Sequence, residues 1–161
     1  MRLVLFLIAI TTIIPRTNGQ CTYMVEVSTG DREGAGTDAD VFLRLANSAD
    51  QSLNFQLQRP GNNFERNAVD RFVATNACIG RICKVEVTQN GKYPSSSWYV
   101  KGLNVSVRQS GSNKCVSREI FTIDQWVRDP VMERAGNGFK TKYHWMPASN
   151  CDHGALPNPR C

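Results

Sequence analysis

Apolar and polar residues alternate with a period of two in several short segments of the chain. The strictest examples are residues 23–27, 41–45, 53–57, 82–87 and 103–107, and a looser form runs through residues 116–123. Such alternation places one face of an extended segment on a core and the other in water, which is typical of antiparallel strands. No long window shows the spacing of an amphipathic helix, so the pattern predicts an all-β fold.

Clusters of residues that favour turns separate these segments. They fall at residues 30–36, 47–50, 60–63, 90–91, 94–97 and 111–113. Asn90 followed by Gly91 is a strong tight-turn signal, because both residues tolerate positive φ. Short strands separated by turn signals every 8–12 residues or so favour a sandwich or a barrel. Since no internal repeat or low-complexity linker interrupts the pattern, we expect one domain.

Residues 1–19 are predicted to be a secretory signal peptide. Arg2 precedes an almost unbroken apolar run over residues 3–14, and Pro15 and small polar residues follow as far as Gly19. This order is that of a signal peptide, and the run is shorter than the roughly 20 apolar residues that a bilayer-spanning helix needs. We therefore expect cleavage after Gly19 and export through the endoplasmic reticulum to the extracellular space.

The charge balance of the chain is only mildly basic. Nineteen Lys and Arg residues stand against fourteen Asp and Glu residues, for a net charge of +5, and Arg2 and Arg16 would leave with the signal peptide. A small positive charge favours docking on an anionic surface. Nucleic-acid binding usually requires a dense stripe of basic residues, which this chain lacks, so we do not expect a nucleic-acid partner.

Six cysteines lie in the part of the chain that would be exported. They are Cys21, Cys78, Cys83, Cys115, Cys151 and Cys161. An even number of cysteines in an exported chain predicts disulfides, although six cysteines allow 15 pairings and the sequence does not choose among them. Cys78 with Cys83 and Cys151 with Cys161 would close short loops, which would leave Cys21 with Cys115. A zinc site is not expected, because the spacings match no compact ligand motif.

Three loop motifs, in this order, carry a resemblance to a known family. They are the Gly-Thr-Asp turn at residues 36–38, the Asn-Asn-Phe-Glu turn at residues 62–65, and the Ser-Trp-Tyr-Val segment at residues 97–100. Over roughly residues 21–126 the chain resembles the PLAT domain of polycystins, lipoxygenases and alpha-toxin, and especially its secreted single-domain members, which include plant stress-associated proteins. The resemblance implies an eight-stranded antiparallel β-sandwich of two four-stranded sheets.

The resemblance also implies a set of calcium ligands. The loops that bind calcium in lipoxygenase-type PLAT domains match the following positions: the backbone oxygens of Gly36 and Thr37, and the side chains of Asp38, Asn62, Asn63, Glu65 and Ser97. Calcium prefers six to eight oxygen ligands. Because Asn63 and residues 96–97 replace acidic residues of the family pattern, we expect any site to be weak, with a Kd of about 10⁻⁴–10⁻³ M as in other extracellular modules.

The same loop residues also have purely structural interpretations. Asp38 could cap its own turn through backbone N–H groups, Glu65 could pair with Arg66 or Arg71, and Asp70 could anchor its strand. Docking on a membrane would need exposed apolar residues beside the ion site. The loop at residues 31–34 is charged instead, so the expected membrane or partner contacts are Lys92 and Tyr93. Trp98 is expected in the core.

Asn104 begins an Asn-Val-Ser glycosylation sequon. Alternation places it opposite Leu103 and Val105, so a glycan fits only if that sheet face is open to solvent.

The sequence contains no pattern typical of an enzyme. Two histidines are too few for a multi-histidine iron site, and neither a G-x-S-x-G elbow nor an H-E-x-x-H helix occurs. We therefore expect a non-catalytic secreted module with a PLAT domain at residues 20–129 and a cysteine-tied extension at 130–161. It is expected to bind a membrane lipid surface or an extracellular protein, with calcium as a weak cofactor. The alternative is an extracellular structural or matrix protein without a small ligand.

Overall fold

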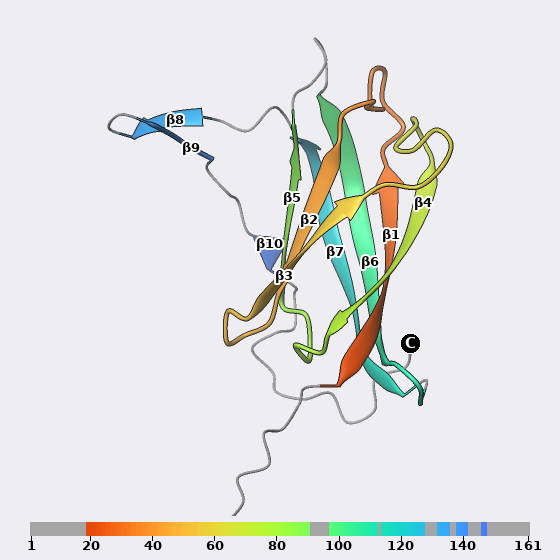
Figure 1. Cartoon of the computed structure of the whole chain (residues 1–161). Helices are drawn as coiled ribbons and strands as arrows, with labels where there is room; N and C mark the ends of the chain where they lie inside the picture. The colour runs from red at the N-terminus through yellow and green to blue at the C-terminus, as the bar shows by residue number, and fades with distance from the viewer. Residues whose placement is uncertain are drawn as a thin grey trace, which may run out of the picture.

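The computed structural model describes residues 19–90, 97–112 and 114–127, and the backbone of three further short strands. Two four-stranded antiparallel sheets make up the sandwich, as predicted (Figure 1). The first sheet has the order β4-β1-β6-β7, formed by Val69–Ala77, Gln20–Thr29, Trp98–Gln109 and Cys115–Val127. The second has the order β10-β5-β2-β3, formed by Met146–Pro147, Lys84–Gln89, Val41–Ala46 and Ser52–Leu57.

Residues beyond 129 contribute strands as well. β10 supplies the fourth strand of the second sheet by pairing Met146 with Val85 and Pro147 with Lys84. β8 (Met132–Ala135) and β9 (Gly138–Thr141) pair with each other as a separate two-stranded sheet. The division at residue 129 stays a prediction. So does the signal peptide, because residues 1–18 lie outside the described part of the chain. Among the described residues, no helix has the length and apolar character needed to cross a bilayer.

The core lies between the two sheets and follows the alternation of the sequence. In β1, Tyr23, Val25 and Val27 are buried while the residues between them are partly exposed. In β2, Leu43 and Leu45 point toward the same interior. Because the apolar side chains of both sheets meet in one cluster, burial of this cluster supplies the main force that holds the sheets together.

Strand β4 departs from the expected pattern. Its inward positions include Asp70 and Phe72, whereas Val69 and Val73 lie on the outer face and are 57% and 70% exposed. Because a polar residue faces inward and two valines face outward, hydrophobic alternation did not predict this strand. Its position comes from the antiparallel register with β1, which pairs Met24 with Val73.

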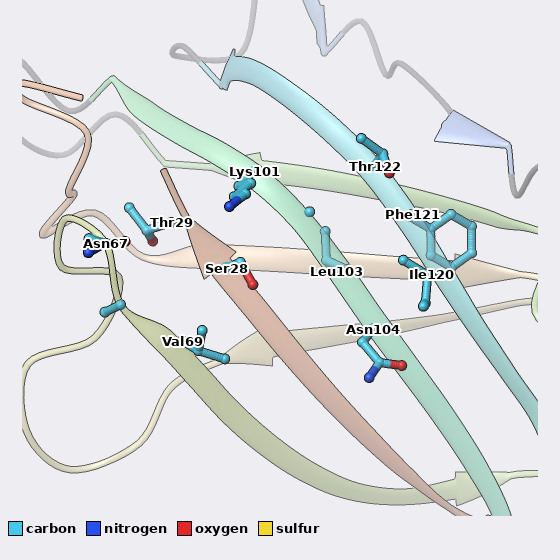
Figure 2. A pocket seen from close by; sticks show the side chains of 12 residues that line it. Ser28, Thr29, Asn67, Val69, Lys101, Leu103, Asn104, Ile120, Phe121 and Thr122 are labelled. Carbon is cyan, nitrogen blue, oxygen red and sulfur yellow. The ribbon is translucent and has the colours of Figure 1, made fainter. Parts of the chain in front are cut away.

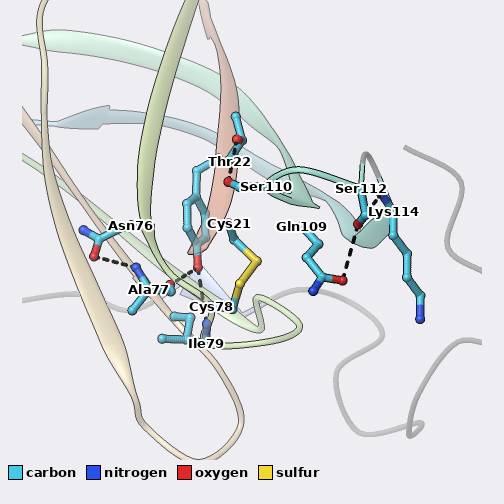
Figure 3. The surroundings of a disulfide bond; sticks show 11 residues. Cys21, Thr22, Asn76, Ala77, Cys78, Ile79, Gln109, Ser110, Ser112 and Lys114 are labelled. Atoms are coloured by element: carbon cyan, nitrogen blue, oxygen red, sulfur yellow. Dashed lines mark hydrogen bonds between the residues drawn. A yellow bond between two sulfur atoms is a disulfide. The ribbon is translucent and has the colours of Figure 1, made fainter. Parts of the chain in front are cut away.

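The disulfide pairing corrects the sequence-based interpretation. Cys21 bonds Cys78, so pairings of Cys78 with Cys83 and of Cys21 with Cys115 are wrong (Figure 3). The β1–β4 register places Cys21 opposite Asn76, which brings the chain just beyond β4 beside the start of β1. Cys83 lies beside the other sheet, directly before β5, where its N–H donates to the Ala46 carbonyl.

Cys83 and Cys115 also take part in disulfides, and no described cysteine is free. Cys151 and Cys161 lie outside the described residues. Beside the Cys21–Cys78 bond, the Tyr23 hydroxyl donates to the Ala77 carbonyl at 2.7 Å and accepts from the Ile79 N–H at 3.3 Å (Figure 3). The disulfide and this tyrosine therefore fix the same end of the sandwich.

Candidate functional site

Three segments that are distant in sequence meet at one end of the sandwich. The Thr37 N–H donates to the Phe64 carbonyl at 3.2 Å, and the Tyr99 N–H donates to the Ala35 carbonyl at 3.0 Å. Glycine suits position 36, because a β-carbon there would lie only 3.1 Å from the Phe64 oxygen, closer than most such contacts. The Gly-Thr-Asp turn, the Asn-Asn-Phe-Glu turn and the start of β6 are thus adjacent, and we call this end of the molecule the loop end.

An aromatic cluster of Trp98, Phe64 and Phe72 packs in the core beside the loop end. Trp98 is fully buried, its ring packs edge-on against Phe64 at 4.8 Å, and its Nε1 donates to the Thr29 Oγ1 at 3.0 Å. Phe64 also stacks on Phe72 at 5.5 Å. The core position expected for Trp98 is confirmed. Because Phe64 directly precedes Glu65 and its carbonyl accepts from Thr37, the residue before Asp38, these rings help to position both loops.

Asp70 and Asn63 have structural roles in the second loop. Asp70 accepts a hydrogen bond from the Phe64 N–H and another from Arg59, so the interpretation of Asp70 as an anchor is confirmed. The Asn63 Oδ1 accepts from the Arg59 Nε at 2.8 Å, and its Nδ2 donates to the Arg59 carbonyl at 2.9 Å. Since both polar atoms of Asn63 already have partners, calcium would have to displace Arg59 to use it.

The two acidic candidates, Asp38 and Glu65, differ from Asp70 and Asn63 in having no partner in the described part of the chain. Asp38 and Glu65 are exposed, and neither carboxylate makes a hydrogen bond or an ion pair within the described residues. The interpretation of Asp38 as a turn cap is wrong, because the Thr37 Oγ1 accepts the Ala39 N–H instead. The pairing of Glu65 with Arg66 or Arg71 is wrong as well. Those arginines pair with Asp31 and Glu26, respectively.

The remaining predicted ligands lie in the described part of the chain, whereas the two predicted membrane or partner contacts do not. Asn62 is exposed on the second loop, and Ser97 is partly exposed at the start of β6. Lys92 and Tyr93 lie outside the described residues. In the parts of the chain that the structure covers, no group of three or more His, Cys, Asp or Glu side chains is placed to hold a metal ion. The loop end therefore offers two carboxylates and neutral oxygens.

Sequence reasoning missed a cationic and aromatic cluster beside the loop end. The guanidinium carbon of Arg32 lies 4.2 Å from the centre of the Tyr99 ring, and Trp126 packs edge-on against the same ring at 5.2 Å. The Tyr99 hydroxyl donates to the Asp124 Oδ1 at 2.7 Å, and this bond together with burial raises the pKa of Tyr99. Trp126 remains 36% exposed. The register of β6 with β7, which pairs Tyr99 with Trp126, creates the cluster.

The outer face of the first sheet carries the glycosylation sequon. Asn104 lies on central strand β6, where its Nδ2 donates to the Glu26 Oε2 at 3.0 Å. A depression of about 310 Å³ lies beside it, bordered by Val69 and Ile120 (Figure 2). Ile120 is 65% exposed. This face is therefore open to solvent over the described residues, which is the condition that a glycan on Asn104 requires.

The fold and the loop end define a β-sandwich module, and comparison with known proteins places it in a family. A PLAT/LH2 domain matches residues 23–133, so the chain belongs to the PLAT domain family. It is 32% identical over 114 residues to the human (Homo sapiens) protein named lipoxygenase homology domain-containing protein 1. That match covers 71% of this chain and 5% of the human protein.

Solved structures agree with this assignment. The structure of coral 8R-lipoxygenase, described as showing "calcium activation via a C2-like domain", superposes with a TM-score of 0.57 at 25% identity, covering 79% of this chain and 17% of that one. Alpha toxin from Clostridium absonum shares the fold alone, with a TM-score of 0.53 at 17% identity, covering 81% of this chain and 33% of that one. This chain thus spans a small part of the proteins that it matches. PLAT domains are non-catalytic modules that also occur within enzymes such as lipoxygenases.

Proposed function

We propose that this chain is a secreted PLAT module that docks onto an anionic lipid surface through its loop end, with calcium as a weak bridging ion. The observation that carries the proposal is the pair of exposed, unpartnered carboxylates of Asp38 and Glu65. They stand on two loops that the hydrogen bond between Thr37 and Phe64 holds together. Two carboxylates without cationic partners leave a local negative charge that a cation would neutralise.

Calcium fits this donor set better than a transition metal does. The available ligands are oxygens, namely the two carboxylates, the Asn62 amide, the Ser97 hydroxyl and nearby carbonyls, which hard cations prefer. Two carboxylates are few for a calcium site, and Asn63 is held by Arg59. We therefore expect a Kd of about 10⁻⁴–10⁻³ M, the range of weak extracellular sites.

The cluster of Arg32, Tyr99 and Trp126 supports docking on lipid. An exposed indole beside a cation suits the boundary between headgroups and acyl chains, where Trp and Arg are favoured. Trp126 and Arg32 contact the same tyrosine ring next to the loop end. Export is proposed from residues 1–19, and the Cys21–Cys78 disulfide suits an oxidising compartment. The calcium activation described for coral 8R-lipoxygenase gives the proposal a precedent in that protein.

Calorimetric titration with calcium tests the ion site. The disulfide-bonded chain should bind calcium weakly, and the double variant Asp38→Ala/Glu65→Ala should release no binding heat. The matched control is Glu33→Ala/Asp50→Asn, which removes two exposed acids elsewhere, leaves the Asp31–Arg66 ion pair in place and should keep the wild-type heat. Equal heats from both double variants would contradict the assignment of Asp38 and Glu65.

Sedimentation with vesicles tests the docking surface. The chain should sediment with phosphatidylserine-containing vesicles in calcium and much less with pure phosphatidylcholine vesicles or with chelator. Trp126→Ala should weaken sedimentation while leaving calcium heat unchanged. Failure to bind calcium and vesicles would instead favour a protein partner, or the alternative of a disulfide-bonded extracellular structural protein.

A further inference from the structure

Two neighbouring rows of outward-facing residues cross the first sheet. The strand registers align Arg71, Glu26, Asn104 and Ile120 in one row, and Val69, Ser28, Gly102 and Thr122 in the next. The two central residues of the second row are a serine and a glycine, so the sheet face is hollow there. This hollow is the depression of about 310 Å³ in Figure 2, and we call it the sheet-face depression.

Gly102 lines the depression without a side chain. A β-carbon at this position would lie 2.6 Å from the Phe121 carbonyl oxygen, so any other residue would force β6 and β7 apart. The pairing of these two strands therefore requires glycine, and glycine leaves the hollow open. The depression is a consequence of the sheet itself and not of a loop conformation.

The walls of the depression combine apolar side chains with free hydroxyl groups. Ile120 is 65% exposed and Val69 is 57% exposed, and both border the depression. The hydroxyls of Ser28 and Thr122 also border it and make no side-chain hydrogen bond among the described residues. Such walls suit a small ligand that has an apolar face and polar groups at its rim.

Asn104 stands at the border of the depression, directly across from Ile120. Its Nδ2 donates to the Glu26 Oε2 at 3.0 Å, and its Oδ1 accepts from the Arg118 Nε at 3.4 Å. Arg118 pairs with Ser106, so it lies on the side of Asn104 away from Gly102. A group attached to the Asn104 amide therefore has open space over Gly102.

We propose that the sheet-face depression binds the first N-acetylglucosamine of a glycan on Asn104, which covers Ile120 and Val69. This sugar has a ring face of C–H groups, an acetyl methyl group and hydroxyls at its rim, which match the apolar walls and the free hydroxyls. The volume lies at the lower end of the roughly 300–1,000 Å³ of small-molecule sites, which suits one ring. Attachment to Asn104 also gives the sugar a high local concentration that a free saccharide lacks.

The glycan is attached by substitution at the Asn104 amide. The Nδ2 atom forms a bond to C1 of the sugar, the bond from C1 to the diphosphate of a lipid-linked oligosaccharide breaks, and one amide proton is released. The remaining Nδ2 hydrogen keeps the bond to Glu26. Because sequons of this kind are modified in exported chains, the inference rests on the export part of the proposed function, and needs neither calcium nor lipid.

Urea unfolding of the disulfide-bonded chain tests the contact. The secreted protein, trimmed by an endoglycosidase to one N-acetylglucosamine, is compared with Ser106→Ala, which lacks the glycan but keeps Asn104. The sugar should lower the unfolding equilibrium constant by about fivefold, the effect of removing about 40 Å² of apolar surface from water.

Ile120 and Val73 provide a matched pair for this test. Both are exposed β-branched residues on the outer face of the first sheet, at 65% and 70%, but only Ile120 borders the depression. The stabilisation by the sugar should fall to about twofold or less in Ile120→Thr and stay near fivefold in Val73→Thr. Any effect of Ser106→Ala itself is common to both backgrounds. Equal stabilisation in the two variants would overturn the proposal.

Two measurements on the trimmed wild type do not depend on stability. Nuclear Overhauser spectra should show the acetyl methyl of the sugar in contact with the methyl groups of Ile120, and absence of this contact would overturn the proposal. Sedimentation velocity should show a monomer. Dimers that Ile120→Thr abolishes would show that a second copy of the chain covers this face, and would overturn the proposal as well.

Failure of this proposal is distinguishable from failure of docking at the loop end. Ile120→Thr should keep calcium heat and sedimentation with anionic vesicles, and Asp38→Ala/Glu65→Ala should keep the stabilisation by the sugar. A chain secreted without a glycan would overturn the sugar contact alone. A chain retained in the cytosol of a eukaryotic cell would overturn export together with the glycan.

Discussion

The Oδ2 atom of Asp70 accepts a 2.7 Å hydrogen bond from the backbone N–H of Phe64, six residues earlier in the chain. Phe64 has a positive φ of 60°, a backbone conformation that residues other than glycine adopt only at a cost in free energy. The buried carboxylate thus stabilises a strained residue at the centre of the loop that carries Asn62 and Glu65. The geometry of the candidate ion site depends on a residue that contacts no ligand.

Asp70→Ala should lower the free energy of unfolding by about 2 kcal/mol, because the buried Phe64 N–H loses its acceptor. Urea denaturation measures the change. The control is Asp31→Ala, which breaks the exposed pair with Arg66 and should cost about 0.5 kcal/mol or less. If both variants lost the same stability, Asp70 would have no special role in the loop.

Replacing both Cys21 and Cys78 with alanine should lower the free energy of unfolding by about 2–5 kcal/mol, because the disulfide joins residues that are 57 positions apart and restricts the unfolded chain. The double replacement avoids an unpaired thiol. Peptide mapping of the non-reduced protein should recover a linked peptide containing these two residues. A peptide linking Cys78 to Cys83 would contradict the pairing.

Glu86 should make stability depend on pH. It is 1% exposed, its carboxylate oxygens accept no hydrogen bond in the described structure, and the nearest cation, Arg44, is 3.9 Å away. Burial raises its pKa, an effect that the charge of Arg44 opposes. The folded state therefore binds the proton more tightly than the unfolded state. Stability should fall as pH rises from the ordinary glutamate pKa to the raised one, and then stay at the lower value.

Glu86→Gln tests this dependence through the melting temperature measured from pH 2 to pH 8. The variant should gain stability over the wild type at neutral pH, and the gain should vanish at the acidic end. Asp50→Asn is a control of opposite sign. A hydrogen bond from Lys84 lowers the pKa of Asp50, so its contribution is present at neutral pH and is lost as pH falls through that lowered pKa. A constant difference for Glu86→Gln at all pH values would contradict the assignment.

Asn104 should carry an N-linked glycan when the chain is exported from a eukaryotic cell. Its side chain lies on the open face of the first sheet, and a glycosylated amide keeps one N–H for the bond to Glu26. Intact mass before and after endoglycosidase treatment measures occupancy. Asn104→Gln and Ser106→Ala should both remove the glycan mass, whereas Ser97→Ala should not. An unmodified wild type would show that the sequon is not used.

Local sequence predicted the strands whose inward residues are apolar. Residues 41–45 and 53–57 fall within β2 and β3, and residues 103–107 lie within β6. Strand β4 was missed because Asp70 faces inward while Val69 and Val73 face outward. Its place is decided by nine paired positions with β1, which are contacts between residues far apart in the chain.

The candidate site divides in the same way. Sequence motifs identified the loops of Asp38, Glu65 and Trp98, because turns and a large aromatic residue have local signatures. The sequence could not predict which carboxylates lack a cationic partner, because that depends on which acid each arginine contacts in the folded chain. Arg66 forms an ion pair with Asp31 and Arg71 forms one with Glu26, so Glu65 stays unpaired. The cluster of Arg32, Tyr99 and Trp126 was missed for the same reason.

The sequence by itself determined an all-β chain with its polar turns and its even set of cysteines, since these follow from periodicity and residue type along one segment at a time. Only the tertiary structure decided that Cys21 bonds Cys78, that Asp70 holds the loop of Phe64, and that Tyr99 lies opposite Trp126. Each of these depends on register and on the spacing between sheets, which are set by packing of the whole core.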